Sequence, residues 1–474
     1  MSMDKILIGR EKEQETILTR LNSNESEFIA IYGRRRIGKT YLVRRMLDDK
    51  FTFFLTGMDN VSMQDQLTNF ALTLRKYVGH DVDVPENWLY AFDMLTQYLE
   101  SLPEGKKIIF IDEMPWLDTP KSRFISALEH FWNSWAAVRD DVKLIACGSA
   151  TSWMINELIN NRGGLHNRLT LKILLEPFSL RECKMYFDYH NFGYSEKEIA
   201  ECYMVMGGIP FYLKQMRKEL SVAQNIDALF FEIGGQLSDE YQNLIRSLFR
   251  HSTNYIKIID IISSKGIGLS RLDILELTGL QNNGGLTAML DELVNCGFIR
   301  EYMPIGKIKK NSLYQLVDPF MLFYFKFIQS NKYHNEHFWT ESISSPLLDS
   351  WREYAFEMLC LNHSKQIKAA LGIAGVNCKI SSWRSEKKKK GAQIDLVIDR
   401  ADQAINICEM KYSKKTFSIT SKYKQELENK IDRFREETGT QKSVRLTMVT
   451  TNGTAHNQHS GIVQNEITLS DLFK

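Results

Sequence analysis

Eight residues near the beginning of the chain have the types and spacing of a phosphate-binding loop. Residues 33–40 read G-R-R-R-I-G-K-T, with an apolar stretch before them and a helical pattern after them. Such glycines let the backbone turn tightly and direct its N–H groups toward a polyphosphate at a helix N-terminus. Lys39 is expected to reach the β and γ phosphates, and the Thr40 hydroxyl to bind Mg²⁺. The residues predicted to bind ATP here are Gly33, Arg34, Arg35, Arg36, Ile37, Gly38, Lys39, Thr40 and Tyr41.

An acidic pair at the end of another apolar stretch supplies the other half of such a site. Residues 107–113 read K-I-I-F-I-D-E. Asp112 is expected to hold the Mg²⁺, and Glu113 to orient and polarise the attacking water. The alternative role for an acidic pair at this place is a helix N-cap. Ser149, near the end of the apolar stretch 142–150, is predicted to sense the γ phosphate.

Five apolar stretches in the first half of the chain alternate with helical patterns, and this alternation predicts an α/β fold with a doubly wound parallel sheet. These stretches are residues 28–32, 51–57, 107–113, 142–150 and 169–177. The phosphate-binding loop follows the first of them, and the acidic pair ends the third. The predicted sheet would therefore position both halves of the ATP site.

Length and composition limit the class of protein. A chain of 474 residues is expected to form roughly three domains, and 43% apolar with 25% charged residues is ordinary globular composition, which excludes collagen, coiled-coil and low-complexity proteins. The net charge of +2 requires any nucleic-acid contact to come from local basic patches.

Cysteine spacing and hydropathy indicate a cytoplasmic protein without a membrane partner. The seven cysteines are scattered and contain no C-x-x-C pair, which favours reduced thiols over disulfides or structural zinc. The chain has no apolar run near the roughly 18 residues of a membrane span, and its first residues become charged too early for a signal peptide.

The loop, the acidic pair and the sheet pattern together resemble the AAA+ and STAND-related P-loop ATPases, specifically the archaeal-type ATPase family of prokaryotes. Residues 8–11, I-G-R-E, resemble the opening motif of that family, which implies that Ile8 and Arg10 lie near the adenine. Arg168 stands where AAA+ proteins carry an arginine finger, with Arg162 as the competing residue. The alternative role of Arg168 is a salt bridge or a surface charge.

The same resemblance implies a helical lid. Residues 207–211, G-G-I-P-F, resemble the G-x-P lid motif of STAND ATPases. In that family Gly208 and Pro210 would bring the lid backbone against the nucleotide, whereas Lys214 and Arg217 could supply positive charge instead. Closure of the lid would couple the nucleotide state to the following domains.

Three short helical patterns and a strand pair from residue 255 onward predict a winged helix, a module that often places its third helix in a DNA groove. The third helix carries no lysine or arginine between residues 284 and 295, so direct base reading by it is doubtful. The expected wing carries Lys307, Lys309 and Lys310, which leaves DNA contact through the wing open beside protein packing.

A second set of chemical residues lies in the last third of the chain. Residues 393–411 read as a β hairpin whose turn centres near Asp402, so that residues whose numbers sum to about 804 face each other. Asp395 would then lie opposite Glu409 with β carbons about 5 Å apart, and Lys411 would share their face. Two carboxylates so close repel each other unless a cation lies between them.

Asp395, Glu409 and Lys411 form D-x13-E-x-K, which resembles the PD-(D/E)xK nuclease core. The resemblance implies that the two carboxylates and the Met410 carbonyl bind Mg²⁺ while the lysine helps to activate water. A helix expected over about 347–366 carries Glu357, which matches the helical glutamate of that family. Glu353 is the competing choice for the helical glutamate. Gln393 is a departure, because relatives often have an acidic residue at this position. The lysine run 387–390 is either a DNA contact or a solvated loop.

The chain is therefore predicted to be a multidomain α/β protein that uses ATP and Mg²⁺. Its predicted domains are an ATPase core at 1–177, a helical lid at 178–240, a winged helix at 241–330 and a restriction-endonuclease-like domain at 331–474. The predicted function is an ATP-hydrolysing switch coupled to a metal-dependent nuclease that acts on DNA. The alternatives are a DNA-binding regulator with an inert nuclease fold and a STAND-type assembly hub. An arginine finger acting in trans would require a homo-oligomer, whereas one acting in cis would not.

Overall fold

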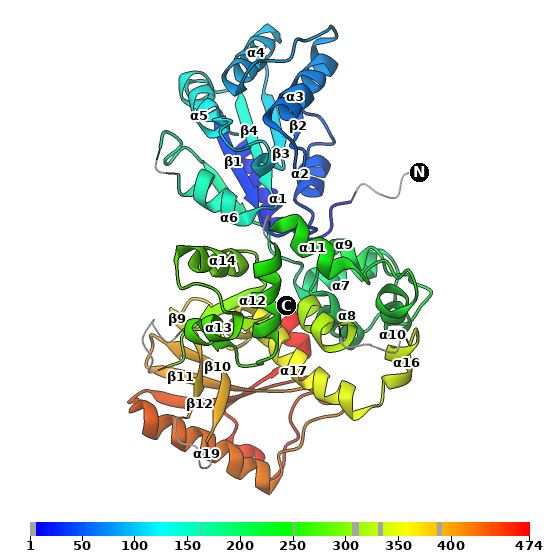
Figure 1. Ribbon diagram of the computed structural model, residues 1–474. Coiled ribbons are helices and arrows are strands. Elements are labelled where there is room, and N and C mark those ends of the chain that lie inside the picture. Colours follow the sequence, from blue (N-terminus) through cyan, green and yellow to red (C-terminus); the bar gives the residue numbers. More distant parts are fainter. Residues whose placement is uncertain (1–5, 162, 250–251, 306–311, 330–334, 386–390) are drawn as a thin grey trace. The chain divides into compact units, whose positions relative to one another are not determined.

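The computed structural model describes residues 6–161, 163–249, 252–305, 312–329, 335–385 and 391–474 (Figure 1). The chain divides into two units, Met1–Glu176 and Pro177–Lys474, and the first contains one sheet and the second two. All seven cysteines are free, in agreement with the prediction of reduced thiols. No helix within the described ranges is long and apolar enough to cross a membrane.

The first unit is built on a five-stranded sheet. Its strands are β1 (Glu27–Tyr32), β2 (Phe53–Thr56), β3 (Lys107–Asp112), β4 (Val142–Gly148) and β5 (Leu171–Leu174). They follow the order β2-β3-β4-β1-β5, and every adjacent pair is parallel. The predicted α/β fold with a parallel sheet is thus confirmed. Because the strands are parallel, the loop after β1, the acidic pair after β3 and Ser149 after β4 leave the sheet at the same edge.

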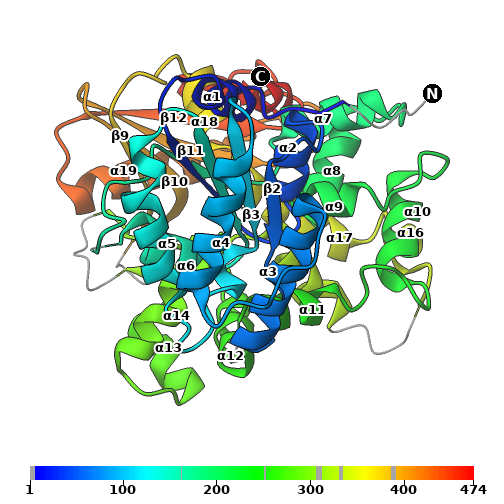
Figure 2. The ribbon, with the colours of Figure 1, turned by 90° about the horizontal axis from the view of Figure 1, so that it is seen from above.

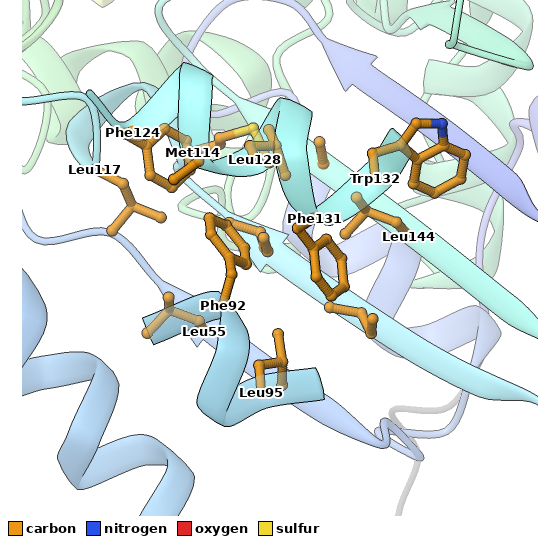
Figure 3. Packing of buried hydrophobic residues seen from close by; sticks show 14 of the residues in the cluster. Leu55, Phe92, Leu95, Met114, Leu117, Phe124, Leu128, Phe131, Trp132 and Leu144 are labelled. Atoms are coloured by element: carbon orange, nitrogen blue, oxygen red, sulfur yellow. The ribbon is translucent and has the colours of Figure 1, made fainter. Parts of the chain in front are cut away.

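Helices pack on both faces of this sheet (Figures 1 and 2). One face carries α3, α4 and α5, whose apolar residues share a core with the strands; Phe92 and Phe131 stack there with ring centroids 5.1 Å apart beside Leu55 and Leu144 (Figure 3). The helices of this unit are α1 (Glu11–Leu21), α2 (Lys39–Met46), α3 (Met63–Val78), α4 (Trp88–Ser101), α5 (Phe124–Ser134) and the short α6 (Thr151–Trp153).

The second unit begins with short helices whose starts are encoded locally. Ser179 and Ser195 cap α7 and α8, and in each case a glutamate three residues later bonds back to the capping residue, which satisfies N–H groups that the helix leaves free. The helices before the winged-helix region are α7 (Leu180–Tyr189), α8 (Glu196–Met206), α9 (Pro210–Leu213), α10 (Val222–Ile226) and α11 (Glu240–Leu248).

A three-stranded sheet and three helices follow in the order predicted for a winged helix. The elements are α12 (Ser252–Ser263), β6 (Leu269–Ser270), α13 (Arg271–Thr278), α14 (Gly284–Asn295), β7 (Ile299–Tyr302) and β8 (Leu313–Leu316). The strands pair antiparallel in the order β6-β8-β7. The predicted wing lysines Lys307, Lys309 and Lys310 lie outside the described residues.

The last part of the chain forms a mixed sheet with the order β13-β12-β11-β10-β9. The β9-β10 and β10-β11 pairs are antiparallel, and the β11-β12 and β12-β13 pairs are parallel. Helix α19 packs its Leu427 and Phe434 against one face of this sheet, and α17 contacts β11. The strands are β9 (Cys378–Arg384), β10 (Gln393–Arg400), β11 (Ala404–Lys411), β12 (Ser443–Thr450) and β13 (Asn465–Thr468). The helices are α15 (Pro319–Phe323), α16 (Phe338–Ser342), α17 (Pro346–Asn362), α18 (Ser364–Ala370) and α19 (Ser421–Thr438).

The single helix expected over about 347–366 is interrupted at His363, between α17 and α18. The buried His363 ring donates through Nδ1 to the Leu359 carbonyl at 2.8 Å and accepts the Leu180 N–H at Nε2 at 3.2 Å. The side chain therefore joins the end of α17 to the beginning of α7. Burial lowers the pKa of His363 from 6.5 to about 4.

We predict that protonation of His363 destabilises the fold in mild acid. Because its folded pKa lies below its unfolded pKa, its contribution to stability is complete above about pH 6.5 and is lost as the pH falls to about 4, with a maximum of about 3 kcal/mol. In His363→Gln the amide oxygen can still accept the Leu180 N–H but does not titrate. Urea unfolding at a series of pH values should show a shallower loss of stability for this variant between pH 6.5 and 4. Parallel pH profiles for the two proteins would contradict the assignment.

Candidate functional site

The loop between β1 and α2 has a backbone that only glycine permits at two positions. Gly33 has a φ of +140°, and a β carbon there would lie 2.4 Å from the Leu175 carbonyl oxygen. Gly38, which begins α2, has a φ of +90°. These conformations bring the loop close to the end of β5 and expose the N-terminus of α2, which is the geometry expected of a phosphate-binding loop.

The Lys39 ammonium folds back over this loop. It is 6% exposed, and its Nζ donates to the carbonyl oxygens of Gly33 at 2.9 Å and Arg34 at 3.0 Å. Two carbonyl oxygens thus hold the ammonium at the loop. The lysine is thus positioned at the loop and can exchange these oxygens for those of a phosphate.

Thr40 and Asp112 meet directly, although 72 residues separate them in the chain. The Thr40 hydroxyl lies 2.9 and 3.1 Å from the two Asp112 carboxylate oxygens. Burial and the neighbouring Glu113 charge raise the pKa of Asp112 to about 6, while the Thr40 hydrogen bond and the Lys39 charge lower it only in part. A hydroxyl and a carboxylate are oxygen donors that suit Mg²⁺, and an undercompensated buried charge favours a bound cation. The pair therefore fits the predicted metal.

Glu113 is held by the end of β4. Its Oε2 accepts hydrogen bonds from the Ser149 backbone N–H at 3.1 Å and from the Ser149 hydroxyl at 2.8 Å. The Glu113 backbone has a φ of 46°, an uncommon conformation for a residue other than glycine. Ser149, predicted to sense a phosphate, thus contacts the residue predicted to polarise water.

The other residues predicted around the nucleotide differ in their surroundings. Arg10 is buried just before α1, and Ile8 is half-buried. Tyr41 is exposed, with the Arg45 guanidinium over its ring. Arg168 is exposed, and its competitor Arg162 lies outside the described residues.

Of the remaining loop residues, Ile37 is buried in the core of the first unit, and Arg34 is buried as well. Arg35 and Arg36 are half-buried, and Arg36 has a φ of 72°. The arginine run therefore does not act as one exposed basic patch.

The G-x-P segment lies in the second unit, where its glycine has a structural role. A β carbon on Gly208 would lie 2.2 Å from the Phe178 carbonyl oxygen, and the Gly208 carbonyl accepts the Phe178 N–H at 2.8 Å. Pro210 begins α9. This close backbone approach explains the glycine without a nucleotide, and the approach of Gly208 and Pro210 to ATP stays a prediction.

The carboxyl-terminal hairpin has the predicted register. The ladder pairs Leu396 with Cys408 and Asp399 with Ile405, so the numbers of paired residues sum to 804. The ladder stops at the Leu396–Cys408 pair, next to a register shift between Ile394 and Val397, so the opposition of Asp395 and Glu409 stays a prediction. The strands pair in this register because the turn at residues 401–403 contains no inserted residue that would shift the pairing.

Glu409 is surrounded by donors, two of which the sequence analysis missed. The Tyr423 hydroxyl donates to its Oε1 at 2.5 Å, Lys430 Nζ to its Oε2 at 2.6 Å, and Lys411 Nζ lies 3.6 Å from Oε1. Burial acts to raise the pKa of Glu409, but the Lys430 and Lys411 charges and these hydrogen bonds hold it below its usual range. Tyr423 and Lys430 follow the spacing of the buried Leu427 and Phe434 on α19, and that shared helix face is the signal that could have identified them.

The other acidic residues lie in the same electrostatic environment. Burial, followed by the charges of Asp395 and Glu409, raises the pKa of Glu357 to about 8, although Lys411 and Lys430 oppose the shift. The Gln393 amide donates to Asp395 Oδ1 at 2.6 Å. The competing Glu353 is exposed. We call Glu357, Asp395, Glu409, Lys411 and Lys430 the carboxylate cluster.

A cation on β7 also influences Asp395. Arg300, on β7, donates through Nε to Gln315 at 2.8 Å and lies over the Tyr302 ring at 4.5 Å. Burial lowers its pKa, and the charge of Asp395 opposes that shift. The Ile305 N–H donates to the Ser382 carbonyl at 3.0 Å, which joins the end of β7 to β9.

The donors of the carboxylate cluster suit Mg²⁺ chemically, since they include three carboxylates and the backbone of the buried Met410. Within the described ranges, however, no three His, Cys, Asp or Glu side chains gather closely enough to hold a metal ion. Oxygens of Asp395 and Glu409 instead accept hydrogen bonds from the chain. The lysine run 387–390 lies outside the described residues.

Comparison with known proteins finds matches for the amino-terminal part of the chain, residues 7–216, which a family model covers as one domain. Residues 7–216 match the family described as an ATPase domain predominantly from Archaea. An uncharacterized protein of Methanocaldococcus jannaschii is 27% identical over 333 residues, which cover 69% of this chain and 70% of that protein. The predicted resemblance to archaeal-type ATPases is thus confirmed for this domain.

Solved structures show more distant likenesses. A Walker-type ATPase of Pyrococcus abyssi is 19% identical, with 68% of this chain and 96% of that chain covered and a TM-score of 0.49. The ORC2 protein of Aeropyrum pernix, in its ADPNP-ADP complexes, is 15% identical. The match covers 70% of this chain and 98% of that chain, with a TM-score of 0.38.

Proposed function

We propose that this protein is an ATP-binding and ATP-hydrolysing switch whose second unit carries a metal-dependent nuclease centre for DNA. The contact between the Thr40 hydroxyl and the buried Asp112 carboxylate carries the ATPase part, because it places the two expected Mg²⁺ donors together beside Glu113. The match of residues 7–216 to an ATPase domain family supports the same activity.

The side chains of the first unit have separate tasks in this proposal. Lys39 exchanges the loop carbonyls for the β and γ phosphate oxygens, and Thr40 with Asp112 holds Mg²⁺. The metal would neutralise charge on the phosphates as the bond to the γ phosphate breaks. Glu113 orients the attacking water after it leaves Ser149, whose hydroxyl and N–H then become available to the γ phosphate.

Two further parts of the switch follow from the family resemblance. The exposed Arg168 can serve as an arginine finger, either in cis or toward the nucleotide of a second copy in a homo-oligomer. Gly208 and Pro210 would move with the nucleotide state and so pass the signal on to the domains that follow them.

Asp395, predicted to lie opposite Glu409, and the Lys411 ammonium, 3.6 Å from Glu409, favour nuclease chemistry as the output. In this proposal Asp395, Glu409 and the Met410 carbonyl bind the metal, Glu357 completes its surroundings and Lys411 helps to activate water. The bound metal would lower the pKa of that water and stabilise charge on the phosphodiester. The alternatives are a platform that binds DNA without cleaving it and a STAND-type assembly protein.

We predict that Glu113→Gln retains ATP binding and loses at least about 100-fold in the rate of hydrolysis, because the amide cannot polarise water. Lys39→Ala should lose ATP binding itself. Fluorescent-nucleotide titration and phosphate release measure the two steps separately. Lys172→Ala, an exposed lysine on β5, is the control and should match the wild type. Tight ATP binding by Lys39→Ala would contradict the phosphate-loop assignment.

We predict that Asp395→Asn abolishes Mg²⁺- or Mn²⁺-dependent cleavage of DNA while ATP turnover persists, since the substitution removes one metal-binding charge. Supercoiled, linear, branched and single-stranded DNA should be tested with and without ATP. Asp402→Asn, in the turn of the same hairpin, is the matched control. Equal cleavage by the wild type and Asp395→Asn would refute the nuclease assignment, and no cleavage by any protein would favour the DNA-binding regulator.

A further inference from the structure

Lys430 is the closest cation to the carboxylate cluster's most buried acid. Its Nζ lies 2.6 Å from Glu409 Oε2, and the two side chains are 25% and 10% exposed. Their ion pair joins α19 to β11. An ion pair so well shielded from water is stronger than one on the open surface.

Neutral donors of the chain also reach two other oxygens of the cluster. Glu409 Oε1 accepts the Tyr423 hydroxyl, and Asp395 Oδ1 accepts the Gln393 amide. The described residues contain no group of three acidic, histidine or cysteine side chains that could hold a metal ion. A divalent cation must therefore displace internal donors before it can bind.

Among these donors only Lys430 contributes a full charge at hydrogen-bonding distance, since Tyr423 and Gln393 are neutral and Lys411 lies farther from Glu409. Its ammonium both occupies a carboxylate oxygen and repels an approaching cation. Electrostatic repulsion at such a distance outweighs the loss of one neutral hydrogen bond.

We infer that Lys430 is the resident counter-ion of Glu409 and sets the affinity of the carboxylate cluster for a divalent cation. Binding of the cation moves the protonated Lys430 away from Glu409 and leaves its charge in solvent, with no covalent change. The inference rests on the proposed metal-dependent function of this cluster. Because Lys430 lies on α19, the position of this helix would help to determine whether the carboxylate cluster binds a metal ion.

Binding of Mn²⁺ to the full-length chain without nucleotide tests this inference. The loss of the free Mn²⁺ signal in electron paramagnetic resonance measures total uptake, and subtraction of the uptake by the same protein with Asp395→Asn isolates binding at the cluster. Lys430→Met should bind Mn²⁺ about ten-fold more tightly than the wild type, because it removes one nearby positive charge. Lys430→Arg retains the charge and should stay within about two-fold of the wild type.

Two further variants separate charge from orientation and from general effects on the fold. Tyr423→Phe removes a donor to Glu409 but no charge, so it should change the affinity less than Lys430→Met does. Lys442→Met breaks a similar ion pair, in which Lys442 Nζ lies 2.5 Å from Asp399, and should leave Mn²⁺ binding unchanged. Lys430→Gln repeats the test if the methionine variant does not fold, as judged by circular dichroism.

Unchanged or weaker Mn²⁺ binding in Lys430→Met would overturn the inference, because the lysine would then be neutral toward the metal or would orient Glu409 for it. An effect of Tyr423→Phe equal to that of Lys430→Met would overturn it as well. If Asp395→Asn leaves Mn²⁺ uptake unchanged in every protein, the cluster binds no metal, and the proposed nuclease function fails together with the inference.

Discussion

The need to compensate buried carboxylates governs both chemical centres of this protein. A carboxylate taken out of water loses hydration that a folded chain must replace with hydrogen bonds or opposite charge. Asp112 and Glu409 are both less than about a tenth exposed, but their partners differ. The character of each centre follows from which partners the surrounding elements supply.

Asp112 is left undercompensated. Thr40 offers a hydroxyl, and the Lys39 ammonium bonds to two loop carbonyls, so that its charge only partly offsets the burial of the carboxylate. The pKa of Asp112 consequently rises to about 6, which corresponds to about 3 kcal/mol against the ionised form. A cation bound beside Asp112 would remove this penalty, so filling the proposed site would stabilise the fold.

The features of the fold and the candidate sites that could be predicted from the sequence depend on residues close together in the chain or on the pairing of two strands across a short turn. The loop around Gly33 and Lys39 is contiguous, and the pairing of Leu396 with Cys408 follows from the position of a tight turn. Tyr423, Lys430 and Arg300 were missed, because they reach the carboxylate cluster from α19 and β7 through packing that no short motif records. The break at His363 was missed for the same reason, since its partner Leu180 lies 183 residues earlier in the chain.

In the carboxylate cluster, unlike at Asp112, charged side chains of the protein itself lie close to the buried carboxylate. Lys411 and Lys430 bring two positive charges to three carboxylates, and burial together with the neighbouring acids raises the pKa of Glu357 to about 8. The lysines and the Tyr423 hydroxyl thus compensate the buried Glu409 from within the chain. A carboxylate compensated in this way gains less from a divalent cation than the undercompensated Asp112 would. If both proposed metal sites bind Mg²⁺, the pair of Thr40 and Asp112 would therefore fill first, and loading of the carboxylate cluster would require a change in the contacts of α19.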